Sequence, residues 1–137
     1  MFKVGVVMNP ISEINYFKDS TLLLMIELQE QGHELFYIDH RNLFFFNQTP
    51  MALTQRAEVY MNQDKWYSLD EEEKISLDIL DAVLMRQDPP FDMNFINNTY
   101  VLESAEKNGL AVINSPSSLR TYNEKLSILN YPKLITD

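Results

Sequence analysis

Val4-Gly5-Val6-Val7-Met8-Asn9-Pro10, near the start of the chain, is a short apolar run that ends at a polar residue and a proline. A β-rich run of this length, stopped by a turn signal, predicts a buried strand. Further along, Asp19 and Ser20 are good N-caps, and the apolar residues after them predict a helix over residues 22–31 that Gly32 ends. Residues 34–38 predict a second strand, which completes a β-α-β unit.

The same alternation returns in the second half of the chain. Residues 82–85 predict a third strand, and Asp92 can cap a helix that Gly109 ends before a fourth strand at 110–113. The helix face that we expect to be buried holds Phe95, Ile96, Thr99, Leu102 and Ala105. A short helix over residues 115–122 and a linker over 130–137 follow.

Strands that alternate with helices predict an α/β fold in which helices cover both faces of a parallel sheet. We expect its strands near residues 3–8, 34–38, 82–86 and 110–113. Between the second and third strands, the pattern changes, and residues 43–67 predict a β-ribbon insertion that stands apart from the sheet.

Composition excludes several classes of function. The 137 residues carry a net charge of −9, and the 11 Lys and Arg residues are scattered, so a nucleic-acid partner is not expected. The chain has no cysteine, and no apolar stretch is long enough to span a bilayer, which fits a cytoplasmic protein without a membrane partner. The acidic run 70–73 is interpreted as a solvated loop or helix start, and no metal site is predicted.

Three predicted strands run straight into a polar residue followed by proline. These turns are Asn9-Pro10, Asp88-Pro89-Pro90 and Asn114-Ser115-Pro116. Each alone is explained as a good turn. Because ligands of open α/β sheets bind outside the carboxyl ends of the strands, the three turns together predict a binding site.

Arg86 follows the apolar residues 83–85 directly, and a guanidinium at the end of a buried strand needs an anionic partner. The partner is either Asp88, in a structural pair, or a carboxylate of the substrate, held through two parallel hydrogen bonds. Asp19 and Ser20, at the start of the first helix, either cap it or help to bind an anion.

Other common sites are not indicated. The three glycines form neither a dinucleotide-binding fingerprint nor a phosphate-binding loop, so a self-contained nucleotide site is not expected. His33 and His40 lack metal-ligand spacing, and both are interpreted as surface or strand-edge residues.

Several stretches together resemble one family, and they occur in its order along essentially the whole chain. They are residues 4–11 with Asn15 and 18–20, Leu84-Met85-Arg86-Gln87-Asp88-Pro89-Pro90-Phe91-Asp92, residues 99–103, 114–120 and 123–126. The chain thereby resembles the N-terminal domain of bacterial glutathione synthases. One departure is Gln87, which stands where the family often has lysine.

The resemblance implies a Rossmann-like pre-ATP-grasp domain over residues 1–122 and, from 123 to 137, the start of a linker to an ATP-grasp domain. The implied reaction ligates γ-glutamylcysteine to glycine with ATP and Mg²⁺, through an acyl phosphate, in a homo-oligomeric enzyme. Residues 1–137 alone are expected to be inactive.

The resemblance also assigns roles to individual residues. Arg86 is expected to be catalytic and to bind substrate, and Lys125 is expected to approach the ATP phosphates as a point charge. The expected substrate-binding residues are Asn9, Asp19, Ser20, Arg86, Asp88 and Asn114. Two alternatives from other classes remain: a stand-alone binding or regulatory module, and a dimerisation domain whose interface is the 43–67 ribbon.

Overall fold

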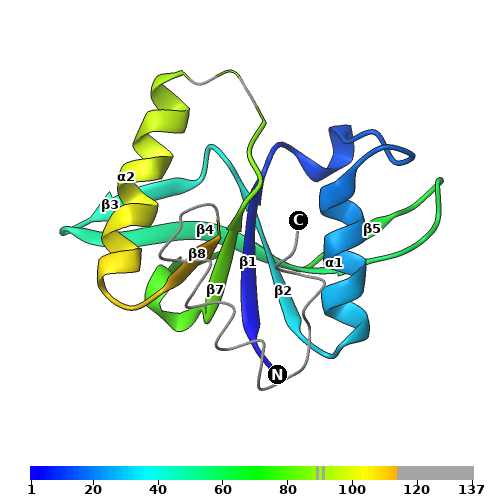
Figure 1. Cartoon of the computed structure of the whole chain (residues 1–137), viewed down its shortest axis with the longest axis horizontal. Helices are drawn as coiled ribbons and strands as arrows, with labels where there is room; N and C mark the ends of the chain where they lie inside the picture. Colours follow the sequence, from blue (N-terminus) through cyan, green and yellow to red (C-terminus); the bar gives the residue numbers. More distant parts are fainter. Residues whose placement is uncertain (89, 91, 114–137) are drawn as a thin grey trace.

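The computed structural model describes residues 1–88, 90 and 92–113 (Figure 1). The predicted helix at 115–122, the linker and the domain boundary after residue 122 lie outside the described residues. So do Asn114 and Lys125.

Four parallel strands form the predicted half of the sheet. β1 is central: Val6 is paired with Tyr37 of β2 on one side and with Leu84 of β7 on the other, and β8 pairs with β7. The elements of this half are β1 (Lys3–Met8), α1 (Ser20–Glu30), β2 (Glu34–Asp39), β7 (Ala82–Met85), α2 (Met93–Lys107) and β8 (Ala111–Ile113). The predicted parallel strands are therefore confirmed.

The two faces of this sheet bury separate hydrophobic clusters, because successive side chains of a strand point to opposite faces. Val4, Val6 and Met8 pack in the cluster that contains Leu22, Met25 and Leu28 of α1. Val7 packs in the cluster that contains Val101, Leu102 and Ala105 of α2. The two helices therefore cover opposite faces of the sheet, as predicted (Figure 1).

Both helices have the predicted residues at their ends, although α1 runs from Ser20 to Glu30 and the prediction was 22–31. The Asp19 carboxylate accepts a hydrogen bond from the Leu22 N–H at 2.9 Å, and the Asp92 carboxylate accepts one from the Phe95 N–H at 3.0 Å. After the helices, Gly32 and Gly109 adopt φ angles of +88° and +106°, which glycine reaches without steric cost.

The buried face of α2 differs from the predicted one. Ile96 is 41% exposed and Thr99 is also exposed, whereas Asn98 is fully buried. The buried residues of this helix are Asn98, Val101, Leu102 and Ala105. The prediction placed the apolar Ile96 in the core, but the polar Asn98 is buried instead. Asn98 can be buried because its amide donates hydrogen bonds to His40, which follows β2, and to Gln87, which follows β7.

The ribbon is part of the main sheet, so the prediction that it stands apart is wrong. Antiparallel pairing of β4 with β2 joins Leu35 to Ala57 and Phe36 to Arg56. The ribbon also extends beyond the predicted residues 43–67, because it consists of β3 (Leu43–Phe46), β4 (Thr49–Val59), β5 (Tyr67–Leu69) and β6 (Glu73–Ser76). The physical reason is that β2 would otherwise leave a row of unpaired backbone groups along its free edge.

Short connections complete the described chain. A turn of 3₁₀ helix, η1 (Ile11–Glu13), follows β1, and another, η2 (Leu77–Ile79), precedes β7. Residues 70–73 are all exposed. Residues 70–72 lie between β5 and β6, as expected for a solvated loop, whereas Glu73 is the first residue of β6. None of the helices described here has the length and apolar character needed to cross a bilayer.

Candidate functional site

The carboxyl ends of β1, β2 and β7 meet at one edge of the sheet, which is uppermost in Figure 1. The Arg86 N–H donates to the Val7 carbonyl at 2.8 Å, and the His40 N–H donates to the Met8 carbonyl at 3.0 Å. These bonds extend the strand pairing by one residue, so that Asn9, His40 and Arg86 leave the sheet side by side.

Arg86 extends from this edge to the first turn of α1. Its Nε–H donates to Thr21 Oγ1 at 3.1 Å and its Nη2 donates to Ser20 Oγ at 2.8 Å. Within the described part of the chain, no carboxylate lies within ion-pair distance of Arg86, so the structural pair with Asp88 is not formed there. Two neutral hydroxyls hold the guanidinium in place, and no carboxylate of residues 1–88, 90 and 92–113 compensates its charge.

Asn9 joins the first polar turn to the one after β7. Its side-chain carbonyl accepts a hydrogen bond from the Asp88 N–H at 2.7 Å. The Asp88 side chain itself is exposed. The bond fixes the two turns against each other, as expected for neighbouring strands that end at the same sheet edge.

A cleft of about 370 Å³ opens beside these turns. It is lined by Asn9, Pro10, Glu13, Ile14, Asn15, Lys18, Asp19 and Asp88. Three predicted site residues, Asn9, Asp19 and Asp88, therefore line one cleft. Ser20 and Arg86 form the hydrogen-bonded pair at the start of α1, next to Asp19 in the chain, and they are not among the lining residues.

A partly buried polar network around the buried Asn98, on the opposite face, escaped the sequence analysis. The Asn98 amide donates to the His40 carbonyl at 2.6 Å and to Gln87 Oε1 at 2.8 Å, and Gln87 Nε2 donates to Asn94 Oδ1 at 2.9 Å. The network ties α2 to the residues that follow β2 and β7. Its only sequence signal was a pair of asparagines at the helical spacing of four, Asn94 and Asn98.

The His40 ring takes part in this network through Nδ1. This nitrogen lies 2.6 Å from Asn94 Oδ1 and 3.3 Å from Gln87 Nε2. His40 thus lies at the end of β2, as expected for a strand-edge residue.

Asp39 and Arg41 stabilise the turn after β2. Arg41 donates from Nε and Nη2 to the two Asp39 oxygens, at 2.9 and 2.7 Å. Burial favours the neutral Asp39 carboxyl, but hydrogen bonds from Arg41 and its positive charge hold the pKa of Asp39 below its usual value. This carboxylate is thereby neutralised within its own turn.

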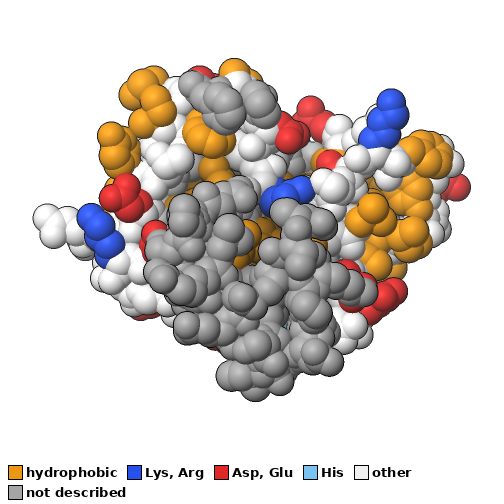
Figure 2. All heavy atoms as spheres, in the orientation of Figure 1, with side chains coloured by type: hydrophobic (Ala, Val, Ile, Leu, Met, Phe, Trp, Pro, Cys, Tyr) orange, Lys and Arg blue, Asp and Glu red, His pale blue; other side chains and the backbone are white. Residues whose placement is uncertain are grey.

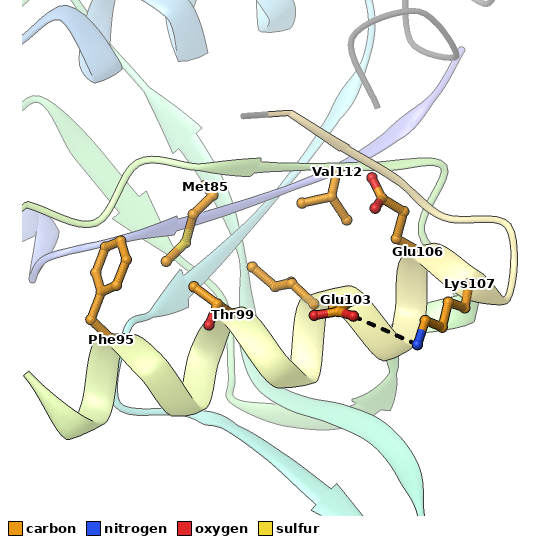
Figure 3. Close-up of a pocket in the computed structure, with 8 residues that line it drawn as sticks. Met85, Phe95, Thr99, Glu103, Glu106, Lys107 and Val112 are labelled. Carbon is orange, nitrogen blue, oxygen red and sulfur yellow. Dashed lines mark ion pairs between the residues drawn. The ribbon is translucent and has the colours of Figure 1, made fainter. Parts of the chain in front are cut away.

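A larger hollow of about 700 Å³ lies between α2 and the strands β7 and β8 (Figure 3). Met85, Phe95, Leu102 and Val112 make most of its lining apolar. The ion pair of Lys107 and Glu103, 3.6 Å apart, belongs to α2 (Figure 3). Among the described residues, those predicted to bind substrate do not line this hollow, so the cleft at the sheet edge remains the candidate site.

The described residues contain no group of three or more His, Asp and Glu side chains that could hold a metal ion. The acidic side chains of the cleft, Glu13, Asp19 and Asp88, therefore do not form such a centre. The cleft instead offers one cation, Lys18, two amides and three carboxylates, a set that suits a ligand with both charge signs.

Comparison of the sequence with known proteins finds several relatives. Residues 2–120 match the family described as "Prokaryotic glutathione synthetase, N-terminal domain". A glutathione synthetase of Citrobacter rodentium is 48% identical over 126 residues, which are 92% of this chain and 40% of that protein. One of Yersinia pestis is 44% identical over 137 residues, which are 100% of this chain and 43% of that protein. The chain thus spans about two fifths of the length of these relatives.

Proposed function

This chain belongs to the family of prokaryotic glutathione synthetase N-terminal domains, and from that premise we propose that it supplies the peptide-binding part of a ligase. The ligase joins γ-glutamylcysteine to glycine in an ATP-dependent reaction. The observation that carries the proposal is the cleft at the sheet edge, where Asn9, Asp19 and Asp88 come together beside the Arg86 guanidinium.

The charges of this edge support a dipolar peptide as ligand. γ-Glutamylcysteine carries carboxylates and an ammonium group. Lys18 and the amides of Asn9 and Asn15 can meet a carboxylate, whereas Asp19 and Asp88 can accept from the ammonium group. A ligand of this kind satisfies both charge signs of the cleft in one pose.

Arg86 is the group that we propose to recognise an anionic part of the substrate. Its present partners, the Ser20 and Thr21 hydroxyls, are neutral, so an incoming carboxylate or phosphoryl group gains a full charge–charge attraction. The same hydroxyls keep the guanidinium oriented before the ligand arrives, which reduces the entropic cost of binding.

In the proposed reaction, the cysteinyl carboxylate takes the terminal phosphoryl group of ATP and releases ADP. The glycine amine then attacks the acyl phosphate, loses a proton and displaces phosphate. The residues of this chain bind and orient the peptide. Lys125, which lies outside the described residues, is proposed to approach the ATP phosphates. No group of three or more His, Asp and Glu side chains among the described residues could hold a metal ion, so no step is assigned to Mg²⁺ here.

The test is a chimera. Residues 1–137 of this chain replace the matching 43% of the Yersinia pestis relative, and the rest of that protein is kept. We predict that the chimera forms the tripeptide in an ATP-dependent manner and that the purified 137-residue chain does not. Coupled measurement of ADP release and tripeptide checks both. A folded chimera without ligase activity would contradict the proposed function, and ligation by the chain alone would contradict its role as one part of the ligase.

We also propose that the enzyme is cytoplasmic and homo-oligomeric. Hydrophobic side chains gather over α1 in Figure 2, and Phe17 and Leu23 are 73% and 59% exposed. Such a patch supports an interface between subunits. Sedimentation velocity of the chain and of a Leu23→Ser variant tests the oligomer, and cell fractionation tests the location.

A further inference from the structure

The cleft owes its shape to one irregular segment. Residues 9–19 supply seven of its eight lining residues, and Asp88 is the eighth. This segment contains one turn of 3₁₀ helix and otherwise forms local turns, such as the bonds from the Lys18 and Asp19 N–H groups to the Asn15 carbonyl. Local turns alone leave a loop free to move as a unit, so its bonds to distant residues decide whether the cleft is preformed.

Two aromatic side chains hold this segment by the backbone of Ile11. The Ile11 N–H donates to the Tyr37 hydroxyl oxygen at 3.3 Å, and Trp66 Nε1–H donates to the Ile11 carbonyl at 2.9 Å. Ile11 is 2% exposed. Both backbone groups of a buried residue are thus satisfied by side chains that lie 26 and 55 positions away along the chain.

Trp66 reaches this position because the ribbon is fastened to α1. The amide of Gln29 accepts from the Val59 N–H and donates to the Val59 carbonyl, both at 2.8 Å. One residue further, the Tyr60 N–H donates to the Trp66 carbonyl at 2.9 Å. The indole also packs against Tyr16, with ring centroids 5.9 Å apart. The end of β4 therefore sets where the indole N–H lies.

We propose that Tyr37 and Trp66 are positioning residues, which hold Ile11 so that residues 9–19 keep the shape of the peptide-binding cleft. The ribbon then takes part in the site by carrying Trp66, although none of its residues lines the cleft. The identity of the ligand, γ-glutamylcysteine, rests on the proposed function, whereas the clamp on Ile11 does not.

Hydrogen exchange of the 137-residue chain tests the clamp without any ligand. Trp66→Phe keeps an aromatic ring and removes the N–H, and Tyr37→Phe removes only the hydroxyl. We expect each variant to speed amide exchange of residues 11–19 about three- to tenfold relative to amides of β1, the range of one net hydrogen bond. Tyr67→Phe is the matched control, since its ring packs 5.9 Å from Trp66 and it has no bond to this segment. Equal exchange of these residues in all three variants would overturn the proposal.

Calorimetric titration with γ-glutamylcysteine tests the consequence for the cleft. Where the wild-type chain binds the peptide, we expect Trp66→Phe and Tyr37→Phe to weaken binding about three- to tenfold and Tyr67→Phe to leave it unchanged. Unchanged affinity in the first two variants would overturn the claim that the clamp preforms the cleft. No binding by the wild-type chain would count against the proposed ligand alone, and the exchange result would still decide the clamp.

Trp66 also provides an intrinsic signal, because it is the only tryptophan of the chain. Its indole lies directly behind the segment that lines the cleft, so ligand binding is expected to change its emission. Saturable change on adding γ-glutamylcysteine, with the same dissociation constant as calorimetry, supports the clamp. Calorimetric binding without any change in emission counts against it.

Discussion

At the scale of single residues, the neutral partners of Arg86 determine what its substitution should do. In the chimera, Arg86→Ala removes charge and fork together, and Arg86→Lys keeps the charge but loses the planar fork. A charge-assisted contact contributes roughly 1.5–3 kcal/mol, so we predict that Arg86→Ala lowers kcat/KM for γ-glutamylcysteine about ten- to a hundredfold. Arg86→Lys should fall between the wild type and Arg86→Ala.

The control for this prediction is Arg56→Ala. This substitution also removes one positive charge. However, the Arg56 guanidinium lies in β4 of the ribbon and is already paired with Glu34 of β2 at 2.6 Å. Its kinetic constants should match those of the unmutated chimera. If Arg86→Ala lowers the melting temperature and leaves its kinetic constants unchanged, Arg86 is a structural residue.

His33 provides a prediction about pH. It was expected at the surface or a strand edge, but its side chain is buried directly before β2, where Nδ1 accepts from the Phe2 N–H at 2.9 Å. Burial, and then the positive N-terminus, lower the pKa of His33 below 6.5. Between the folded and unfolded pKa values, the unfolded chain binds more protons. The contribution of the neutral His33 to the free energy of unfolding is therefore fully present above about pH 6.5, and it is lost as the pH falls through the folded pKa of His33.

Thermal unfolding across this pH range checks the prediction. His33→Gln keeps a side-chain acceptor for the Phe2 N–H and removes the titrating group. The melting temperature of the wild type should fall more steeply with acidification than that of the variant. Parallel curves would show that His33 contributes nothing to acid sensitivity.

The positions of candidate site residues were predictable from the sequence where the signal is local. Arg86 follows three apolar strand residues, and Asn9 and Asp88 belong to turns, so their place at the sheet edge could be predicted. Trp66 and Tyr37 could not be assigned, because their partner Ile11 lies far away along the chain and no periodic pattern records such a bond. Asn98 was overlooked for a similar reason: its burial depends on backbone carbonyls and amides of other elements.

At the scale of elements, the N-cap of α2 can be tested by itself. Asp92 is exposed, and its carboxylate satisfies the Phe95 N–H at the start of this helix. We predict that Asp92→Ala lowers the free energy of unfolding by about 1 kcal/mol, the usual cost of a lost N-cap. Chemical denaturation measures it. Asp92→Ser should restore most of the loss, and an equal loss in both variants would mean that capping is not the cause.

The elements of the parallel half were predictable because caps, glycines and apolar periodicity all lie within each segment. The sequence predicted that the ribbon forms strands. It did not predict that the ribbon joins the main sheet through the pairing of β4 with β2. Its β4 alternates between buried and less buried residues, which fits either an isolated hairpin or an edge of the main sheet. Only the unpaired edge of β2, a property of the assembled sheet, distinguishes the two arrangements.

At the scale of the whole molecule, the fold combines a parallel unit that carries the candidate site with an antiparallel extension that contacts it through Trp66. The parallel strands bring Asn9 and Arg86 to one edge, and the extension returns Trp66 to the segment behind the cleft. The parallel unit can be predicted from the alternation of strands and helices in the sequence. The antiparallel extension depends on pairing between segments that are brought together only after the chain has folded.

The hydrogen bond between the Asn9 side chain and the Asp88 backbone joins residues 79 positions apart. This separation bears on the order in which parts of the protein fold. β1, α1 and β2 are consecutive, so they can associate as a nucleus with little loop-closure entropy. Pairing of β1 with β7 closes a much longer loop, which contains the whole ribbon, so we expect it to follow. We therefore expect the cleft to be completed late in folding, so that an intermediate with a native-like first half would not yet be able to bind its ligand.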